Sequence, residues 1–95
     1  MANALLSIQV IPKVDEKDLY SFVDEAIAVI EATNVKYKVH PLETTMEGEL
    51  SELLQIVQKM NEKMSELGVP SVISQVKIAY RQEGITMDEL VEKYQ

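Results

Sequence analysis

The sequence predicts a ferredoxin-like α+β fold, in which β-α-β-β-α-β elements form one antiparallel sheet with both helices on one face, followed by a short extra helix. Four stretches alternate with the period of a β-strand, and two longer stretches repeat apolar residues every three or four positions, as amphipathic helices do. Their order is that of two βαβ units joined by a hairpin, with right-handed crossovers. The 95 residues fit one domain, residues 1–95.

The first strand and the first helix are delimited by local signals. Residues 4–11 alternate between a wholly apolar face and a mixed face, and Pro12 ends the strand because it lacks a backbone N–H. Asp15 suits the N-cap of a helix that runs to about Thr33, and Asn34 suits a left-handed conformation that stops the helix. The apolar face of this helix consists of Leu19, Phe22, Val23, Ala26 and Ile30.

The middle of the chain predicts a hairpin and then a long helix. Residues 35–40 alternate, Pro41 interrupts them, and residues 44–47 form a second short extended run. A helix over residues 50–67 follows, and Gly68 closes it with a proline two residues beyond. Its apolar positions are Leu50, Leu53, Leu54, Val57, Met60, Met64 and Leu67.

The last strand and the tail complete the predicted order. Residues 71–81 alternate again, and Thr86 and Glu89 have the spacing of a capping box. We therefore expect a short helix over residues 86–94. It is too short to be stable alone in water, so its apolar side must dock on this subunit or on another. That side consists of Met87, Leu90, Val91 and Tyr94.

Composition excludes several classes of function. The net charge of −7 disfavours nucleic acid, because such binding rests on Lys and Arg contacts to phosphates. The absence of cysteine excludes disulfides, thiolate catalysis and cysteine-based metal sites. No stretch has the length of a membrane span, and the first residues lack the pattern of a signal peptide, so we expect a cytoplasmic protein. The acids are spaced like solvated helix faces, and His40 reads as a surface residue, so we predict no catalytic or metal-ligating residues.

The face of the sheet without helices is expected to be an interaction surface, because it is neither polar nor apolar throughout. One interpretation is an oligomer interface with incidental polar residues, and the other is a shared interface that holds a ligand pocket. Both predict a homo-oligomer, a dimer or a tetramer built from dimers. The residues on this face are Leu5, Ser7, Gln9 and Ile11, then Thr45 and Glu47, then Ile73, Gln75, Lys77 and Ala79.

Residues 35–49 resemble the thiamine-binding, YkoF-like family of small bacterial and archaeal proteins. The shared pattern is a tyrosine, a proline, a threonine three residues after it, and then Glu-Gly, here Tyr37, Pro41, Thr44 and Glu47-Gly48. Residues 7–12 resemble the first strand of the family, and Gly84-Ile85-Thr86 with Lys93-Tyr94 resembles its tail.

The resemblance implies a ferredoxin-like fold, assembly as dimers and tetramers, and binding of thiamine or its aminopyrimidine precursor without catalysis and without a further cofactor. Hydroxyl, amide and carboxylate groups complement the amine and the ring nitrogens of an aminopyrimidine. The ligand-binding residues expected from the motif and from this chemistry are Ser7, Thr44, Thr45, Glu47, Gly48 and Gln75. His40 and Glu43 depart from the family pattern, which has glycine and a small residue there.

Two other functions stay open on the sequence. One is a structural or regulatory homo-oligomer that binds no vitamin, and the other is a weak enzyme that acts on a small cationic substrate. Glu47 also has an alternative role, as an acid that complements the dipole of the helix over residues 50–67.

Overall fold

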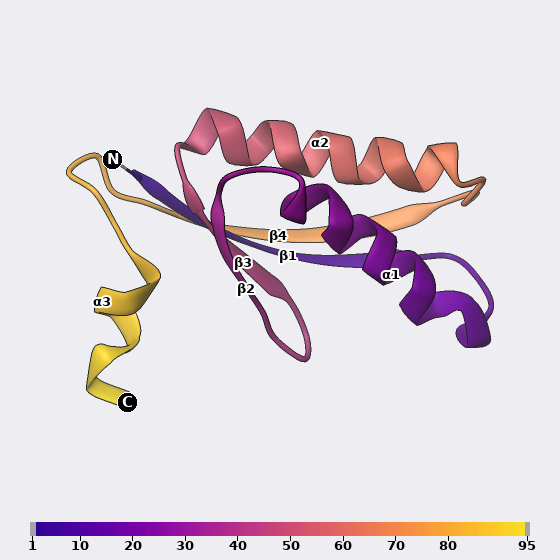
Figure 1. The fold of residues 1–95 in the computed structure, drawn as a ribbon, viewed down its shortest axis with the longest axis horizontal. Helices are drawn as coiled ribbons and strands as arrows, with labels where there is room; N and C mark the ends of the chain where they lie inside the picture. Colours follow the sequence, from indigo (N-terminus) through magenta and orange to yellow (C-terminus); the bar gives the residue numbers. More distant parts are fainter. Residues whose placement is uncertain (1, 95) are drawn as a thin grey trace.

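Four strands form one antiparallel sheet in the order β2-β3-β1-β4 in the computed structural model, which describes residues 2–94 (Figure 1). The ferredoxin-like prediction is confirmed, with element boundaries within about two residues of those expected. In chain order the elements are β1 (Ala4–Pro12), α1 (Glu16–Glu31), β2 (Lys36–Val39), β3 (Thr44–Gly48), α2 (Leu50–Glu66), β4 (Val72–Tyr80), α3 (Met87–Val91) and a 3-10 turn (Glu92–Tyr94).

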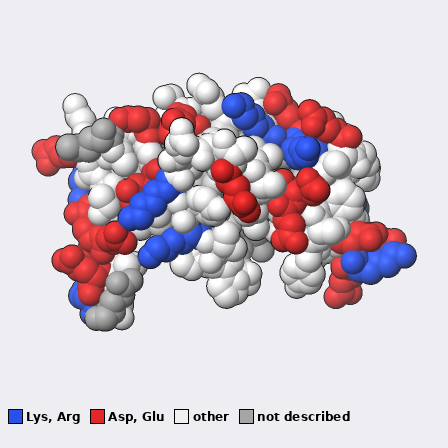
Figure 2. Space-filling view, in the orientation of Figure 1, with Lys and Arg blue, Asp and Glu red and all other residues white. Residues whose placement is uncertain are grey.

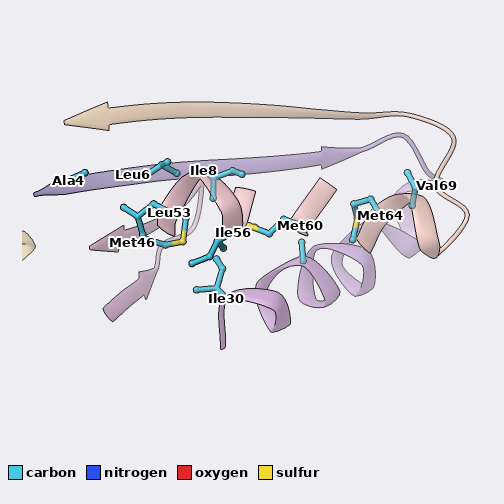
Figure 3. Close-up of a cluster of buried hydrophobic side chains, with 11 residues drawn as sticks. Ala4, Leu6, Ile8, Ile30, Met46, Leu53, Ile56, Met60, Met64 and Val69 are labelled. Atoms are coloured by element: carbon cyan, nitrogen blue, oxygen red, sulfur yellow. The ribbon is translucent and has the colours of Figure 1, made fainter. Parts of the chain in front are cut away.

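The core lies between one face of the sheet and helices α1 and α2 (Figure 3). Strand β1 points Leu6 and Ile8 at this core, and its neighbour β3 adds Met46, which stands opposite Leu6. Side chains from α1 and α2 fill the other side, and the three-four spacing predicted most of them. In α2 the prediction missed the buried Ile56 and included Leu54 and Leu67, which are exposed. The buried helix residues are Ala26, Ile30, Leu53, Ile56, Met60 and Met64.

The ends of the helices show which of the predicted helix boundaries are correct. Gly68 has φ of +82°, the left-handed conformation expected just after α2. The capping box of α3 is present, since the Thr86 hydroxyl accepts from the Glu89 N–H and the Glu89 carboxylate accepts from the Thr86 N–H. The expectation for Asn34 is wrong, because no non-glycine residue among residues 2–94 has positive φ. Helix α1 already ends at Glu31, and the N–H of the following residue, Ala32, donates to the Ala28 carbonyl.

The second face of the sheet, called the outer face below, is free of α1 and α2. It is formed by the odd-numbered residues of β1, β3 and β4, together with their partners Lys36 and Lys38 on β2. Helix α3 lies apart from α1 and α2, near the end of the sheet where β1 begins (Figure 1). None of the helices within residues 2–94 is long and apolar enough to cross a membrane.

Candidate functional site

A pair of hydroxyl groups marks the middle of the outer face. Ser7 on β1 stands opposite Thr45 on β3, and their side-chain oxygens are 2.8 Å apart in a hydrogen bond. The register follows from burial, because Leu6 and Met46 must both face the core, and this leaves Ser7 and Thr45 on the opposite side. Two of the expected ligand residues are therefore brought together.

Helix α3 covers one end of the outer face. The Glu47 carboxylate, next to Thr45 on the same face of β3, accepts a hydrogen bond at 2.8 Å from the backbone N–H of Met87, the first residue of α3. Leu5, Ile85 and Met87 bury one another in a small second cluster. The sequence left open that Glu47 complements the dipole of the helix that follows it, which is α2. In the structure the Glu47 carboxylate instead accepts its hydrogen bond from an N–H of α3.

An ion pair also holds α3 to strand β2. Lys36 Nζ donates to Asp88 Oδ2 at 2.8 Å, and Lys38 Nζ lies 3.9 Å from the other carboxylate oxygen. The hydrogen bond and the charge of Lys36 lower the pKa of Asp88, and the hydrogen bond from Lys36 to Asp88 raises the pKa of Lys36. Both side chains are exposed to solvent, so the pair orients α3 more than it stabilises the fold.

A pocket of about 250 Å³ lies between the outer face and α3. Its walls are mainly apolar, and the residues with polar side chains in its lining are Thr45, Lys38 and His40. Apolar walls with a few placed polar groups are typical of small-molecule sites. The complete lining is Leu5, Lys38, His40, Thr45, Met87, Leu90 and Val91.

The other expected site residues lie elsewhere. Gln75 shares the outer face, opposite Gln9, but lines a separate shallow hollow of about 210 Å³. Thr44 is buried on the helix-covered face opposite Ile8, so the sheet separates its side chain from Ser7 and Thr45. It lines a different groove of about 400 Å³, bounded by α1, the end of β1 and the loop between β2 and β3.

Gly48 also belongs to the helix-covered side. A Cβ added there would lie 3.2 Å from both Glu52 Oε1 and Leu53 Cδ2. The missing side chain therefore makes room for α2. The resemblance placed Gly48 among the ligand-binding residues, and the close approach that the structure shows at Gly48 is that of α2.

Sequence reasoning missed the walls of the pocket that come from the tail and from β2. The residues Met87, Leu90, Val91 and Tyr94 were expected to dock, but the surface on which they dock was not predicted. The first three line the pocket, and Tyr94 is exposed. His40, interpreted as a surface residue, is exposed and lies at the rim of both this pocket and the larger groove. Within residues 2–94 no group of three or more His, Cys, Asp and Glu side chains could hold a metal ion. Acidic and basic side chains are interspersed on the face seen in Figure 2, without a continuous basic surface.

Comparison with known proteins gives consistent matches over the whole chain. A sequence model of the thiamine-binding protein family matches residues 6–95. A UPF0045 protein of Clostridium perfringens is 50% identical over 94 residues, which is 99% of each chain. The crystal structure of a Thermotoga maritima protein proposed to act in thiamine biosynthesis or salvage superposes with a TM-score of 0.91 at 33% identity, covering 98% of this chain and 99% of that one. A domain of unknown function from Bacillus cereus superposes with a TM-score of 0.90 at 41% identity, covering 100% of this chain and 93% of that one.

Proposed function

Because the chain belongs to the thiamine-binding protein family, we propose that it binds thiamine, or the hydroxymethylpyrimidine part of thiamine, without transforming it. Family membership supports a thiamine-related role. The observation that carries the finer proposal is the pocket in which the Thr45 hydroxyl, backed by Ser7, meets apolar walls supplied by α3.

The pocket suits the pyrimidine end of the ligand. Its volume of about 250 Å³ is below the range of about 300–1,000 Å³ that is usual for drug-sized ligands, so one ring system fits inside. An aminopyrimidine can donate to and accept from the Thr45 hydroxyl, and Met87 offers its sulfur to the flat ring. The positive charge of Lys38 in the lining disfavours a buried cation, so the thiazolium extends out of the pocket over the outer face.

A second subunit is part of this proposal. The outer face beyond the pocket leaves Ile11 and Ile73 exposed, and Leu90 is exposed at the pocket itself. Exposed apolar surface of this kind marks an interaction site. We infer that a second copy of the chain covers the outer face, closes the pocket at a subunit interface and makes the protein a dimer or a tetramer. A cytoplasmic location belongs to the same proposal, since a chain without cysteine has no need of an oxidising compartment.

Two neighbouring threonines provide a matched test. Thr45→Val removes the hydroxyl that faces the pocket, and Thr44→Val removes a hydroxyl on the other side of the sheet. By titration calorimetry with thiamine and with hydroxymethylpyrimidine, Thr45→Val should weaken binding by about 1–1.5 kcal/mol, roughly five- to tenfold. Thr44→Val should bind like the parent protein. Equal affinities in both variants would place the ligand elsewhere.

Thermal unfolding distinguishes the proposed function from the alternative, an oligomer without a vitamin ligand. A ligand that binds only the native state raises the midpoint temperature of unfolding as its concentration increases. At a concentration one hundred times Kd, the free energy of unfolding increases by about 2.7 kcal/mol. We expect this shift with thiamine or hydroxymethylpyrimidine. A midpoint that does not move with either compound at millimolar concentration would favour the structural or regulatory oligomer.

A further inference from the structure

A polar hollow of about 210 Å³ lies on the outer face next to the pocket formed with α3, and it is called the Lys77 hollow below. Gln9 of β1 and Gln75 of β4 stand opposite each other in the ladder, and Lys77 is the next residue of β4 on the same face. One ammonium group and two amide groups therefore offer N–H donors to the same space, which suits a ligand group with several acceptor oxygens. The lining consists of Gln9, Leu42, Glu43, Gln75, Val76 and Lys77.

The charge of Lys77 is not matched by any acid of the protein. The other two lysines of the outer face, Lys36 and Lys38, have their ammonium groups 2.8 and 3.9 Å from the carboxylate of Asp88. Within residues 2–94 Lys77 forms no ion pair, and Glu43, although it lines the same hollow, is not at ion-pair distance from it. The Lys77 ammonium is therefore available to an anionic ligand.

The outer face of the strands also differs in charge from the chain as a whole. The net charge is −7, so an anion is repelled by most of the surface. The strands present three lysines and one acid on the outer face, and that acid, Glu47, already accepts from the backbone N–H of Met87. An anion is therefore attracted to this part of the sheet.

The hydroxyl pair of the outer face joins the Lys77 hollow to the pocket at α3. Thr45 lines that pocket, and Ser7 on β1 stands between Thr45 on β3 and Lys77 on β4. Thr45 and Lys77 are thus two strand spacings apart, which is about 10 Å. The bond between the Ser7 and Thr45 hydroxyls uses only one of their two hydrogens, so the pair can still donate to a ligand above it.

We propose that the Lys77 hollow binds the phosphate group of a phosphorylated ligand, thiamine monophosphate, whose pyrimidine occupies the pocket at α3. The inference rests on the proposed function, because the pyrimidine in the pocket sets the direction of the rest of the ligand. The thiazolium then lies over Ser7 and Thr45, and the hydroxyethyl chain that carries the phosphate ester points towards β4. The phosphate accepts from the Lys77 ammonium and from the side-chain amides of Gln9 and Gln75.

Glu43 matches the second charge of this ligand. Thiamine monophosphate has a positive thiazolium and a negative phosphate, and the hollow has one acid and one base. Glu43 precedes β3 and Lys77 belongs to β4, so strand β1 lies between them. The acid is therefore on the thiazolium side of the ligand, and Glu43→Gln should weaken the binding of thiamine and of thiamine monophosphate by the same factor.

Titration calorimetry with thiamine and with thiamine monophosphate tests the proposal. The phosphate makes a charge-assisted contact that thiamine lacks, so thiamine monophosphate should bind the parent protein roughly tenfold more tightly. Lys77 is exposed, and Lys77→Met should bring the two affinities together. Lys17→Met, at an exposed position of α1, removes the same charge and should keep the tenfold difference, so it is the matched control.

Hydroxymethylpyrimidine monophosphate provides a control for the length of the ligand. Its phosphate is one methylene group away from the pyrimidine, so it is too short to reach Lys77 from the pocket. Its affinity should be the same for the parent protein and for Lys77→Met. If Lys77→Met weakened its binding as much as that of thiamine monophosphate, Lys77 would act through long-range charge alone, and the proposed contact would be overturned.

Inorganic phosphate distinguishes the ester from a free anion. At millimolar concentration it should compete with thiamine monophosphate and leave the binding of thiamine unchanged. Inorganic phosphate that binds as tightly as thiamine monophosphate would make the hollow a site for free anions and overturn the link to the vitamin. Equal affinities of the parent protein for thiamine and its monophosphate would overturn this inference and leave the proposed function intact, whereas binding of neither compound would overturn both.

Discussion

Glu47 on β3 accepts a hydrogen bond from the backbone N–H of Met87 at 2.8 Å, which joins the central sheet to the first residue of the tail helix. The two residues are forty positions apart in the sequence. Glu47, the acid of the motif shared with the family, therefore holds in place helix α3, which forms one wall of the pocket. Its carboxylate has a second oxygen, Oε2, which is chemically able to accept from the amine of a ligand.

The first prediction separates the structural role of Glu47 from contact with a ligand. Glu47→Ala leaves the Met87 N–H without its partner, which should lower the free energy of unfolding by about 1 kcal/mol and speed hydrogen exchange at Met87. Glu47→Gln keeps an acceptor oxygen, so α3 should stay docked. If the charge also touches the ligand, Glu47→Gln should weaken thiamine binding by roughly 1.5–3 kcal/mol, about tenfold or more.

Glu25→Ala, at an exposed position on α1, is the control for loss of an acid. Hydrogen exchange by NMR measures the docking of α3, and titration calorimetry measures the contact of Glu47 with the ligand, so the two roles are tested independently. Unchanged exchange at Met87 in Glu47→Ala would show that α3 is held by its other contacts. Unchanged thiamine affinity in Glu47→Gln would leave Glu47 with the structural role only.

The second prediction is that the docking of α3 depends on pH through Asp88. The hydrogen bond from Lys36 lowers the pKa of Asp88 in the folded protein. A group of this kind contributes stability that is present above its unfolded pKa, about 3.9, and is lost as the pH falls through the lower folded value. The raised pKa of Lys36 acts in the opposite direction, and its contribution is lost only as the pH rises through a value above about 10.4.

Docking of α3 should therefore be constant near neutral pH and weaken below about pH 4, before the core unfolds. Amide chemical shifts of Met87 and Leu90 between about pH 3 and 7 measure it. The acid transition should be smaller at high salt, because both partners are exposed. Asp88→Asn should remove the transition, and an identical profile in this variant would assign the pH dependence to another group.

The third prediction concerns the space that Gly48 leaves for α2. Gly48 is not among the glycines with positive φ, so alanine meets no backbone strain there. Its Cβ would, however, lie 3.2 Å from Glu52 Oε1 and from Leu53 Cδ2, and Leu53 is fully buried. Glu52 can move, but Leu53 cannot, so Gly48→Ala should lower the free energy of unfolding by about 1–2 kcal/mol in urea denaturation.

Introducing Gly48→Ala into the Glu52→Ala protein identifies which neighbour of the new methyl group causes the destabilisation. Glu52→Ala removes one of the two close contacts of the new methyl group and keeps the other. Gly48→Ala should therefore destabilise the Glu52→Ala protein by nearly as much as it destabilises the parent. A Gly48→Ala protein as stable as the parent would mean that α2 shifts without cost.

Much of the fold follows from local signals in the sequence. Residues 4–11 repeat with a period of two, and the apolar residues of α2 repeat every three or four positions. These periods show which side of each element is apolar, and this is sufficient to predict the order of the elements and the packing of the helices on one face of the sheet. Gly68 and the pair Thr86 and Glu89 set helix boundaries through interactions within a few residues. Asn34 misled the prediction because a residue that tolerates the left-handed conformation does not require it.

The candidate site was predictable only in part. Alternation placed Thr45 and Glu47 on one face of a strand, but their facing partners depend on the register between strands that are distant in sequence. The motif included Thr44 and Gly48, which the same alternation turns towards the helices, and the close approach at Gly48 belongs to α2.

The sequence by itself determined the elements, their order and the two faces of the sheet, because these depend on the period of the side chains along the chain. Only the tertiary structure decided that α3 docks against Glu47 and Leu5 and that Ile78 stays uncovered although Leu6 beside it is buried. Periodicity gives the direction in which a side chain points. Whether another element reaches it depends on the widths of the helices and on the position of the strand in the sheet. The part of the edge strand β4 from Val76 onward lies beyond the cover that the two helices provide.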